Sequence, residues 1–82
     1  MKQSKYCVST VIFGSRTKYF VLVPENLKYP VYYLSRSNPT IHLVSSPAFI
    51  SKVRNESVCV HHEPLPYKEA EKVAKLLQLL DN

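Results

Sequence analysis

The chain has 82 residues, of which 45% are hydrophobic, six are proline and one is glycine. This length allows a single domain, residues 1–82, and the apolar content excludes a disordered tail. The net charge is +5, but residues 1–54 carry eight basic residues against one acidic residue, whereas residues 55–82 carry three against five. The basic first part favours nucleic acid or an acidic protein surface as a partner, unless the charge serves only solubility.

No stretch of the sequence approaches the roughly 20 apolar residues that a membrane span requires. The N-terminus is basic, but the apolar run after it is short and is interrupted by polar residues, unlike a secretory signal. Two cysteines, Cys7 and Cys59, are too few for a secreted disulfide scaffold, and the sequence leaves open whether they pair. We therefore expect a cytoplasmic protein without a membrane partner.

Residues 6–13 and 18–23 are rich in β-branched and aromatic side chains, and the only glycine, Gly14, lies between them. This pattern predicts a β-hairpin. Apolar side chains occur on both faces of each strand, so we expect the hairpin to be covered on both sides. Its tip would present Arg16 and Lys18 to solvent.

Prolines divide the middle of the chain. Pro24 is expected to end the second strand, and Pro30 precedes a third strand at 31–35, which predicts an edge position for that strand. The sequence leaves open whether the Tyr29–Pro30 bond is cis. A fourth strand follows at 40–45, with alternating apolar side chains.

Ser46 and Pro47 have the pattern of an N-cap followed by a first-turn proline, which predicts a short helix near 47–54. A fifth strand is predicted at 57–61 from its alternating valines. Residues 66–80 then form the clearest pattern in the chain, an amphipathic helix.

One half of the wheel of this last helix is apolar, and we expect it to face the sheet: Tyr67, Ala70, Val73, Ala74, Leu76, Leu77 and Leu80. The other half holds Lys72, Glu71, Lys75 and Gln78, together with Leu79. Leu79 is either a tolerated exposed leucine or the contact residue of a homodimer. The fold class predicted is α+β: an antiparallel sheet of four to five strands, with the helix 66–80 packed on one face.

Catalytic chemistry has little support in the sequence. Cys7, Cys59 and His61 would converge if the first and fifth strands pair, but no spacing typical of a zinc site accompanies them, and we predict no metal. No glycine-rich phosphate loop is present, and we predict no cofactor. The alternative to a binding protein is a small metal-independent ribonuclease of toxin type. Its acid or base would be His42, His61 or His62, and its phosphate ligands Arg16, Lys18 or Arg36.

A set of basic and tyrosine residues between positions 16 and 36 is more suggestive. Tyrosine rings on a sheet stack on bases while Arg and Lys contact phosphates, and the same residue types also anchor protein interfaces. The predicted binding residues are Arg16, Lys18, Tyr19, Lys28, Tyr29, Tyr32, Tyr33 and Arg36. We expect a small, non-enzymatic accessory or phage-type module that binds nucleic acid or a protein of a nucleic-acid-handling complex.

Overall fold

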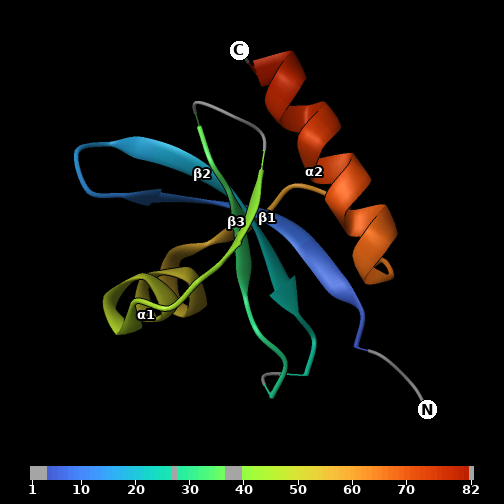
Figure 1. The fold of residues 1–82 in the computed structure, drawn as a ribbon, viewed down its shortest axis with the longest axis horizontal. Coiled ribbons are helices and arrows are strands. Elements are labelled where there is room, and N and C mark those ends of the chain that lie inside the picture. Colours follow the sequence, from blue (N-terminus) through green and yellow to red (C-terminus); the bar gives the residue numbers. More distant parts are fainter. Residues whose placement is uncertain (1–3, 27, 37–39, 82) are drawn as a thin grey trace.

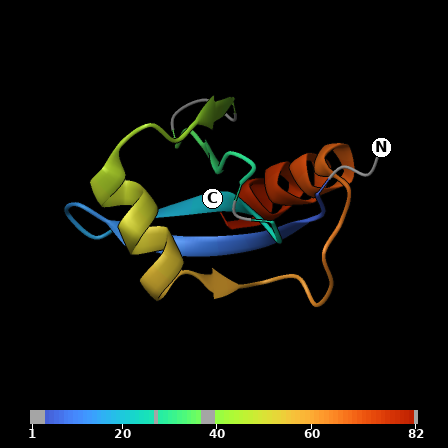
Figure 2. The same ribbon diagram turned by 90° about the horizontal axis from the view of Figure 1, so that it is seen from below.

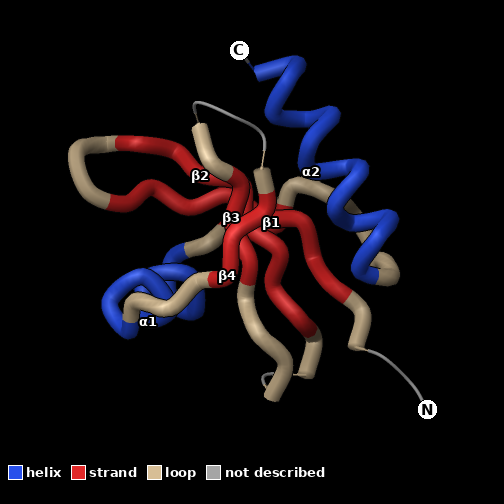
Figure 3. The backbone as a smooth tube through the Cα atoms, in the orientation of Figure 1, coloured by secondary structure: helices blue, strands red, loops and turns tan. Residues whose placement is uncertain are grey.

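The computed structural model describes residues 4–26, 28–36 and 40–81, which form five strands and two helices (Figure 1; Figure 3). In chain order the elements are β1 (Tyr6–Phe13), β2 (Thr17–Pro24), β3 (Tyr32–Leu34), β4 (Ile41–Leu43), α1 (Pro47–Glu56), β5 (Val58–Cys59) and α2 (Tyr67–Asp81). All five strands belong to one antiparallel sheet with the order β4-β3-β2-β1-β5. The α+β class with a terminal helix, predicted from the periodicity, is confirmed.

The β1–β2 hairpin is the centre of the sheet, and its register runs from Tyr6 opposite Pro24 to Phe13 opposite Thr17. Gly14 and Arg16 both have positive φ, 72° and 64°, so the tight turn needs the only glycine of the chain at its start. Pro24 is the last residue of β2, as expected for a residue without a backbone N–H.

The expectation that the third strand lies at an edge is wrong. β3 is internal, because β4 pairs with it on its outer side, with Tyr33 opposite His42. Pro30 lies outside β3, so its missing N–H interrupts no bond of the ladder. The Tyr29–Pro30 bond is trans.

The two helices cover opposite faces of the sheet, as the views along two axes show (Figure 1; Figure 2). α1 begins after an N-cap, Ser46, whose hydroxyl accepts a hydrogen bond from the backbone N–H of Phe49 at 3.3 Å. Its buried residues Phe49 and Val53 enter a cluster with inward-facing strand residues such as Val11 and Val21. The short helix predicted near 47–54 is confirmed.

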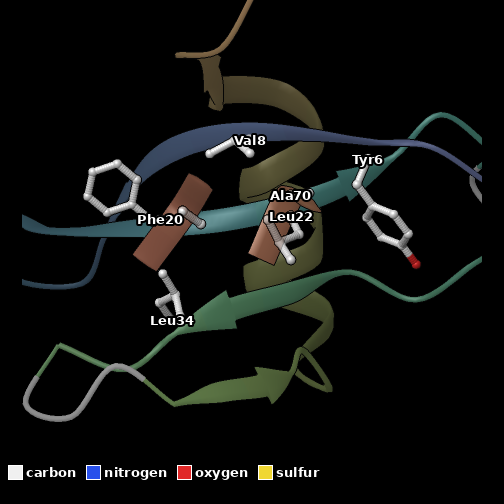
Figure 4. Close-up of a cluster of buried hydrophobic side chains, with 7 residues drawn as sticks. Tyr6, Val8, Phe20, Leu22, Leu34 and Ala70 are labelled. Atoms are coloured by element: carbon white, nitrogen blue, oxygen red, sulfur yellow. The ribbon is translucent and has the colours of Figure 1, made fainter. Parts of the chain in front are cut away.

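On the other face, α2 packs against a second cluster (Figure 4). The large side chains of this cluster come from the strands, and they include Phe20 and Leu22 of β2 and Leu34 of β3. α2 adds two fully buried alanines, Ala70 and Ala74. Because alanine is small, the helix axis lies close above the strands.

The rotation of α2 differs from the one the helical wheel indicated. Gln78, expected in solvent, is buried, and its Nε2 donates to the backbone carbonyl of Ser35 at 3.0 Å. Leu76 and Leu80, expected on the sheet, are exposed. In this orientation the helix turns its small residues toward the strands, and Asp81 of its last turn pairs with Lys18.

Within the described residues, neither helix has the length and apolar character that would let it cross a bilayer.

Candidate binding site

The eight residues predicted to bind a partner do not share one surface. Lys28, Tyr29 and Tyr32 lie at the end of the sheet where β1 and α2 begin, since Tyr29 and Tyr32 line one hollow with Tyr6 and Tyr67. Tyr19 and Tyr33 lie on the α1 face, and Arg16, Lys18 and Arg36 lie toward the hairpin tip and the end of α2.

The first of these places is an open hollow of about 250 Å³, which we call the tyrosine pocket. Its lining residues are Ser4, Tyr6, Tyr29, Pro30, Tyr32 and Tyr67. Four of the six are tyrosines, so most of the wall consists of ring faces and hydroxyl groups. Such a wall accepts a flat, partly polar group.

The rings of the pocket are packed at angles to one another. The ring centroids of Tyr6 and Tyr67 are 5.5 Å apart and nearly perpendicular, and those of Tyr32 and Tyr67 are 5.1 Å apart. The Tyr6 hydroxyl donates to the carbonyl of Pro30 at 3.2 Å. These contacts hold three of the rings in place, while Tyr29 is 37% exposed at the surface.

Burial raises the pKa of the Tyr6 hydroxyl above its ordinary value, and the neighbouring Tyr32, Tyr67 and Tyr29 raise it further. Burial also raises the pKa of Tyr67, with the carboxylate of Glu71 and then Tyr32 as additional causes. Both phenols therefore keep their protons at neutral pH, and the pocket offers uncharged hydroxyl groups.

Backbone hydrogen bonds between segments that are distant in the sequence bring the pocket residues together. Tyr6 and Leu65 exchange two backbone hydrogen bonds, of 2.7 and 2.9 Å, which bring the start of α2 beside the start of β1. The turn after β2 is held to the same end, because the backbone N–H of Asn26 donates to the Ser4 hydroxyl at 3.0 Å. The Asn26 side chain in turn accepts from the backbone N–H of Lys28 at 3.0 Å.

Three lysines flank the pocket in the sequence. Lys5, Lys28 and Lys68 each adjoin a lining residue, all three are exposed, and none forms an ion pair among the described residues. Glu71 acts electrostatically on Tyr67 of the pocket, and it is paired with Lys75 at 2.9 Å. The segments that build the pocket thus carry three exposed lysines, together with the exposed Glu25 and Glu69.

The other two tyrosines of the predicted set serve the core of the α1 face. Tyr33 packs on Phe49 with centroids 5.5 Å apart and on His42 at 5.3 Å, and Tyr19 contacts both Tyr33 and Phe49. Their rings are half-buried. The packing accounts for these two residues without a ligand.

The basic residues at the other end are less available than the sequence indicated. Lys18 forms an ion pair with Asp81 at 3.1 Å and lies over the ring of Phe20, 5.5 Å from its centroid. Arg36 donates to the carbonyl of Lys18 at 3.3 Å. Arg16, at the hairpin tip, is exposed and has no ion pair within the part of the chain that the structure describes.

The cysteine and histidine residues do not form a reactive group. β1 and β5 pair, and both cysteines are free thiols. Burial raises the pKa of Cys7, and the adjacent Cys59 raises it further. The Cys59 thiol donates to the carbonyl of His61 at 2.9 Å. No group of three metal-ligating side chains occurs in residues 4–26, 28–36 and 40–81.

Of the histidines in the ribonuclease alternative, His61 and His62 are neighbours with ring centroids 4.8 Å apart, whereas His42 lies far from both in the sheet. His42 belongs to β4 at one edge, whereas His61 and His62 follow β5 at the other edge. His42 also stacks on Tyr33, and His61 Nδ1 is 2.9 Å from the carbonyl oxygen of Glu63. No observation favours this alternative over binding.

Comparison of the chain with protein families, with curated proteins and with solved structures found no match. The functional argument therefore depends on the tyrosine pocket and the charge around it. Sequence reasoning missed two of its rings, Tyr6 and Tyr67. The only sequence signal for them is a tyrosine at the start of a predicted strand and another at the start of a predicted helix.

Proposed function

We propose that this protein binds single-stranded nucleic acid, with one base stacked in the tyrosine pocket and the adjacent phosphates contacted by the surrounding lysines. The observation that carries the proposal is the convergence of four tyrosines on one open hollow, and exposed lysines next to its lining residues in the chain support it. Proteins that bind single strands combine these two elements, because every base has a face that stacks and every nucleotide has a phosphate.

The details of the pocket agree with this ligand. The volume, about 250 Å³, suits one flat ring system better than an extended peptide. The phenols are neutral at physiological pH and do not repel phosphate. Lys5, Lys28 and Lys68, which adjoin lining residues in the chain, disfavour a cationic ligand, the other kind of ligand that aromatic cages bind.

A labelled single strand tests the proposal directly. Fluorescence anisotropy of a dT or a U oligonucleotide should report binding that weakens steeply with salt. Tyr29→Ala should weaken binding by roughly 5- to 150-fold, which corresponds to about 1–3 kcal/mol per stacked base. The chain has no tryptophan, so quenching of its tyrosine fluorescence reports the stacking independently.

The opposite face of the sheet provides the controls. Tyr33→Ala removes a tyrosine outside the pocket and should leave the affinity unchanged. Lys28→Glu should weaken binding and reduce the salt slope by about one. Lys52→Glu, which changes a lysine of α1, should not. Wild-type affinity for Tyr29→Ala, or binding independent of salt, would show the proposal to be wrong.

A further inference from the structure

A second unusual surface lies on the same face of the sheet, toward the other end of α2. Eight large hydrophobic side chains are exposed among the described residues, and five of them gather here. They are Ile12, Val58, Val60, Leu76 and Leu80, which we call the leucine patch. Leu79 is also exposed, but it lies on the side of α2 opposite the buried Ala70 and Ala74, and Tyr29 and Leu43 lie elsewhere.

The register of the strands puts the sheet residues of the patch on the α2 face. Val58 lies opposite Thr10, and opposed residues of an antiparallel pair share a face. Ile12 is two residues further along β1, so it points the same way. The backbone N–H of Val60 donates to the carbonyl of Val8 at 2.9 Å, and Val8 is part of the core beneath α2.

α2 packs mainly on β1 and β2, so the β5 side of this face is largely uncovered. Between its flank and the strands is an open hollow of about 300 Å³, with Phe20 and Val60 on the sheet side and Leu77 and Leu80 on the helix side. Leu76, one turn before Leu80 and 57% exposed, lies beside it. The surface therefore holds protruding leucines next to a hollow lined by apolar side chains.

We propose that the leucine patch is the contact surface of a homodimer, in which the leucines of each copy enter the hollow of the other across a twofold axis. A twofold contact requires a surface that is complementary to itself, and a patch with both protrusions and a hollow meets that requirement.

The size of the patch agrees with a dimer. Its five side chains are about 60% exposed on average. At about 100 Å² for a fully exposed aliphatic side chain, they present roughly 300 Å² of apolar surface per copy. A standard interface buries about 800 Å² per partner, and in homodimers about 65% of it is apolar. The patch thus supplies most of the apolar area needed, and the partly exposed Leu77 and the aliphatic stem of Lys18 adjoin it.

The charge at the hollow is compatible with a second copy, although Arg16 and Arg36 also lie toward this end of the molecule. Two chains with a net charge of +5 repel each other over most of their surfaces. At the hollow, however, Lys18 is neutralised by Asp81 of its own chain at 3.1 Å. The lysines around the tyrosine pocket lie toward the opposite end of α2, so they stay separated in such a dimer.

Sedimentation velocity and light scattering of the full chain test this inference. The wild type should have twice the 9.4 kDa mass of the chain. Leu76→Asp and Leu80→Asp should each give a monomer with an unchanged circular dichroism spectrum, because surface substitutions rarely disturb the fold. Leu43→Asp is the matched control: Leu43 is 56% exposed on β4, at the other edge of the sheet, and this variant should remain dimeric.

Should an α2 variant lose its helical spectrum, Val58→Asp and Ile12→Asp test the same patch from the strands. A wild type that is monomeric at its highest soluble concentration would overturn the proposal. So would dimers that persist in Leu76→Asp and Leu80→Asp, or dissociation by Leu43→Asp to the same extent. A monomer that floats with phosphatidylcholine–phosphatidylserine vesicles would assign the patch to a lipid surface instead.

Discussion

The two faces of this sheet are covered in opposite ways. α1 has ten residues and inserts two large apolar side chains, Phe49 and Val53, into the core. α2 has fifteen residues, but its buried positions hold Ala70, Ala74 and Gln78. On the α1 face the helix supplies two large side chains of the buried cluster, whereas on the α2 face the fully buried large side chains come from the strands and the helix supplies two alanines. The length of a helix is thus a poor measure of what it contributes to the core.

This difference explains why both candidate surfaces lie on the α2 face. Because the small residues of α2 face the strands, the large side chains near its two ends are available for contacts outside the centre of the core. At its first turn Tyr67 joins the tyrosine pocket, and at its last turns Leu76 and Leu80 form part of the leucine patch. The helix covers the middle of the face, and one of the two candidate surfaces lies near each of its ends.

The largest effect is expected when one large side chain of each helix is truncated, which tests the difference between the two faces of the sheet. Phe49→Ala should cost about 3–5 kcal/mol of unfolding free energy, since Phe49 is buried and its ring stacks on Phe13 with centroids 4.8 Å apart. Leu77→Ala should cost less than about 2 kcal/mol, because Leu77 only adjoins its cluster. Urea unfolding followed by circular dichroism at matched low concentration measures both. Equal losses would contradict the distinction between the faces.

The small residues of α2 give the next prediction. Ala74 has no exposed surface, so Ala74→Leu forces the helix away from the strands and should cost about 1–3 kcal/mol. Ala48→Leu is the matched control, because Ala48 is an exposed alanine in α1, and this change should stay within about 0.5 kcal/mol. Thermal unfolding of the two variants measures the difference. A stable Ala74→Leu protein would mean that α2 does not lie close on the sheet.

Local periodicity predicted the strands and helices well, because the pattern that indicates each of them lies within a short stretch of sequence. Apolar side chains on both faces of the first two strands indicated that the hairpin is covered on both sides. Ser46 with Pro47 indicated the start of α1. The rotation of α2 was not predicted, since a helical wheel ranks residues by polarity only. Gln78 is buried because one carbonyl, that of Ser35, lies within reach of its amide, and that carbonyl is 43 residues away in the chain.

The candidate site was predicted only in part for a similar reason. Tyr29 and Tyr32 were identified from their place in a basic, tyrosine-rich segment, and both line the pocket. Tyr33 was grouped with them because it is adjacent in sequence, although successive residues of a strand point to opposite faces. Tyr6 and Tyr67 meet only because of the backbone bonds between Tyr6 and Leu65, and long-range pairings of this kind leave no local pattern.

The smallest predicted effect concerns the hydroxyl of Tyr6, which distinguishes the polar end of the α2 face from its apolar end. At neutral pH, Tyr6→Phe should cost about 1 kcal/mol, because it removes the hydrogen bond to the carbonyl of Pro30. In alkaline solution the difference between the two proteins narrows. Burial, followed by Tyr32 and Tyr67, raises the pKa of Tyr6, so the folded protein holds this proton more tightly than the unfolded chain.

That stabilisation is complete below the ordinary tyrosine pKa of 10.0 and is lost as the pH rises above it. The wild type should therefore lose more stability than Tyr6→Phe between pH 8 and about pH 10.5, and the two should converge. Urea unfolding at the two pH values measures this. Parallel losses in both proteins would mean that the Tyr6 hydroxyl titrates alike in the folded and unfolded states, and that the pocket around it is open to water.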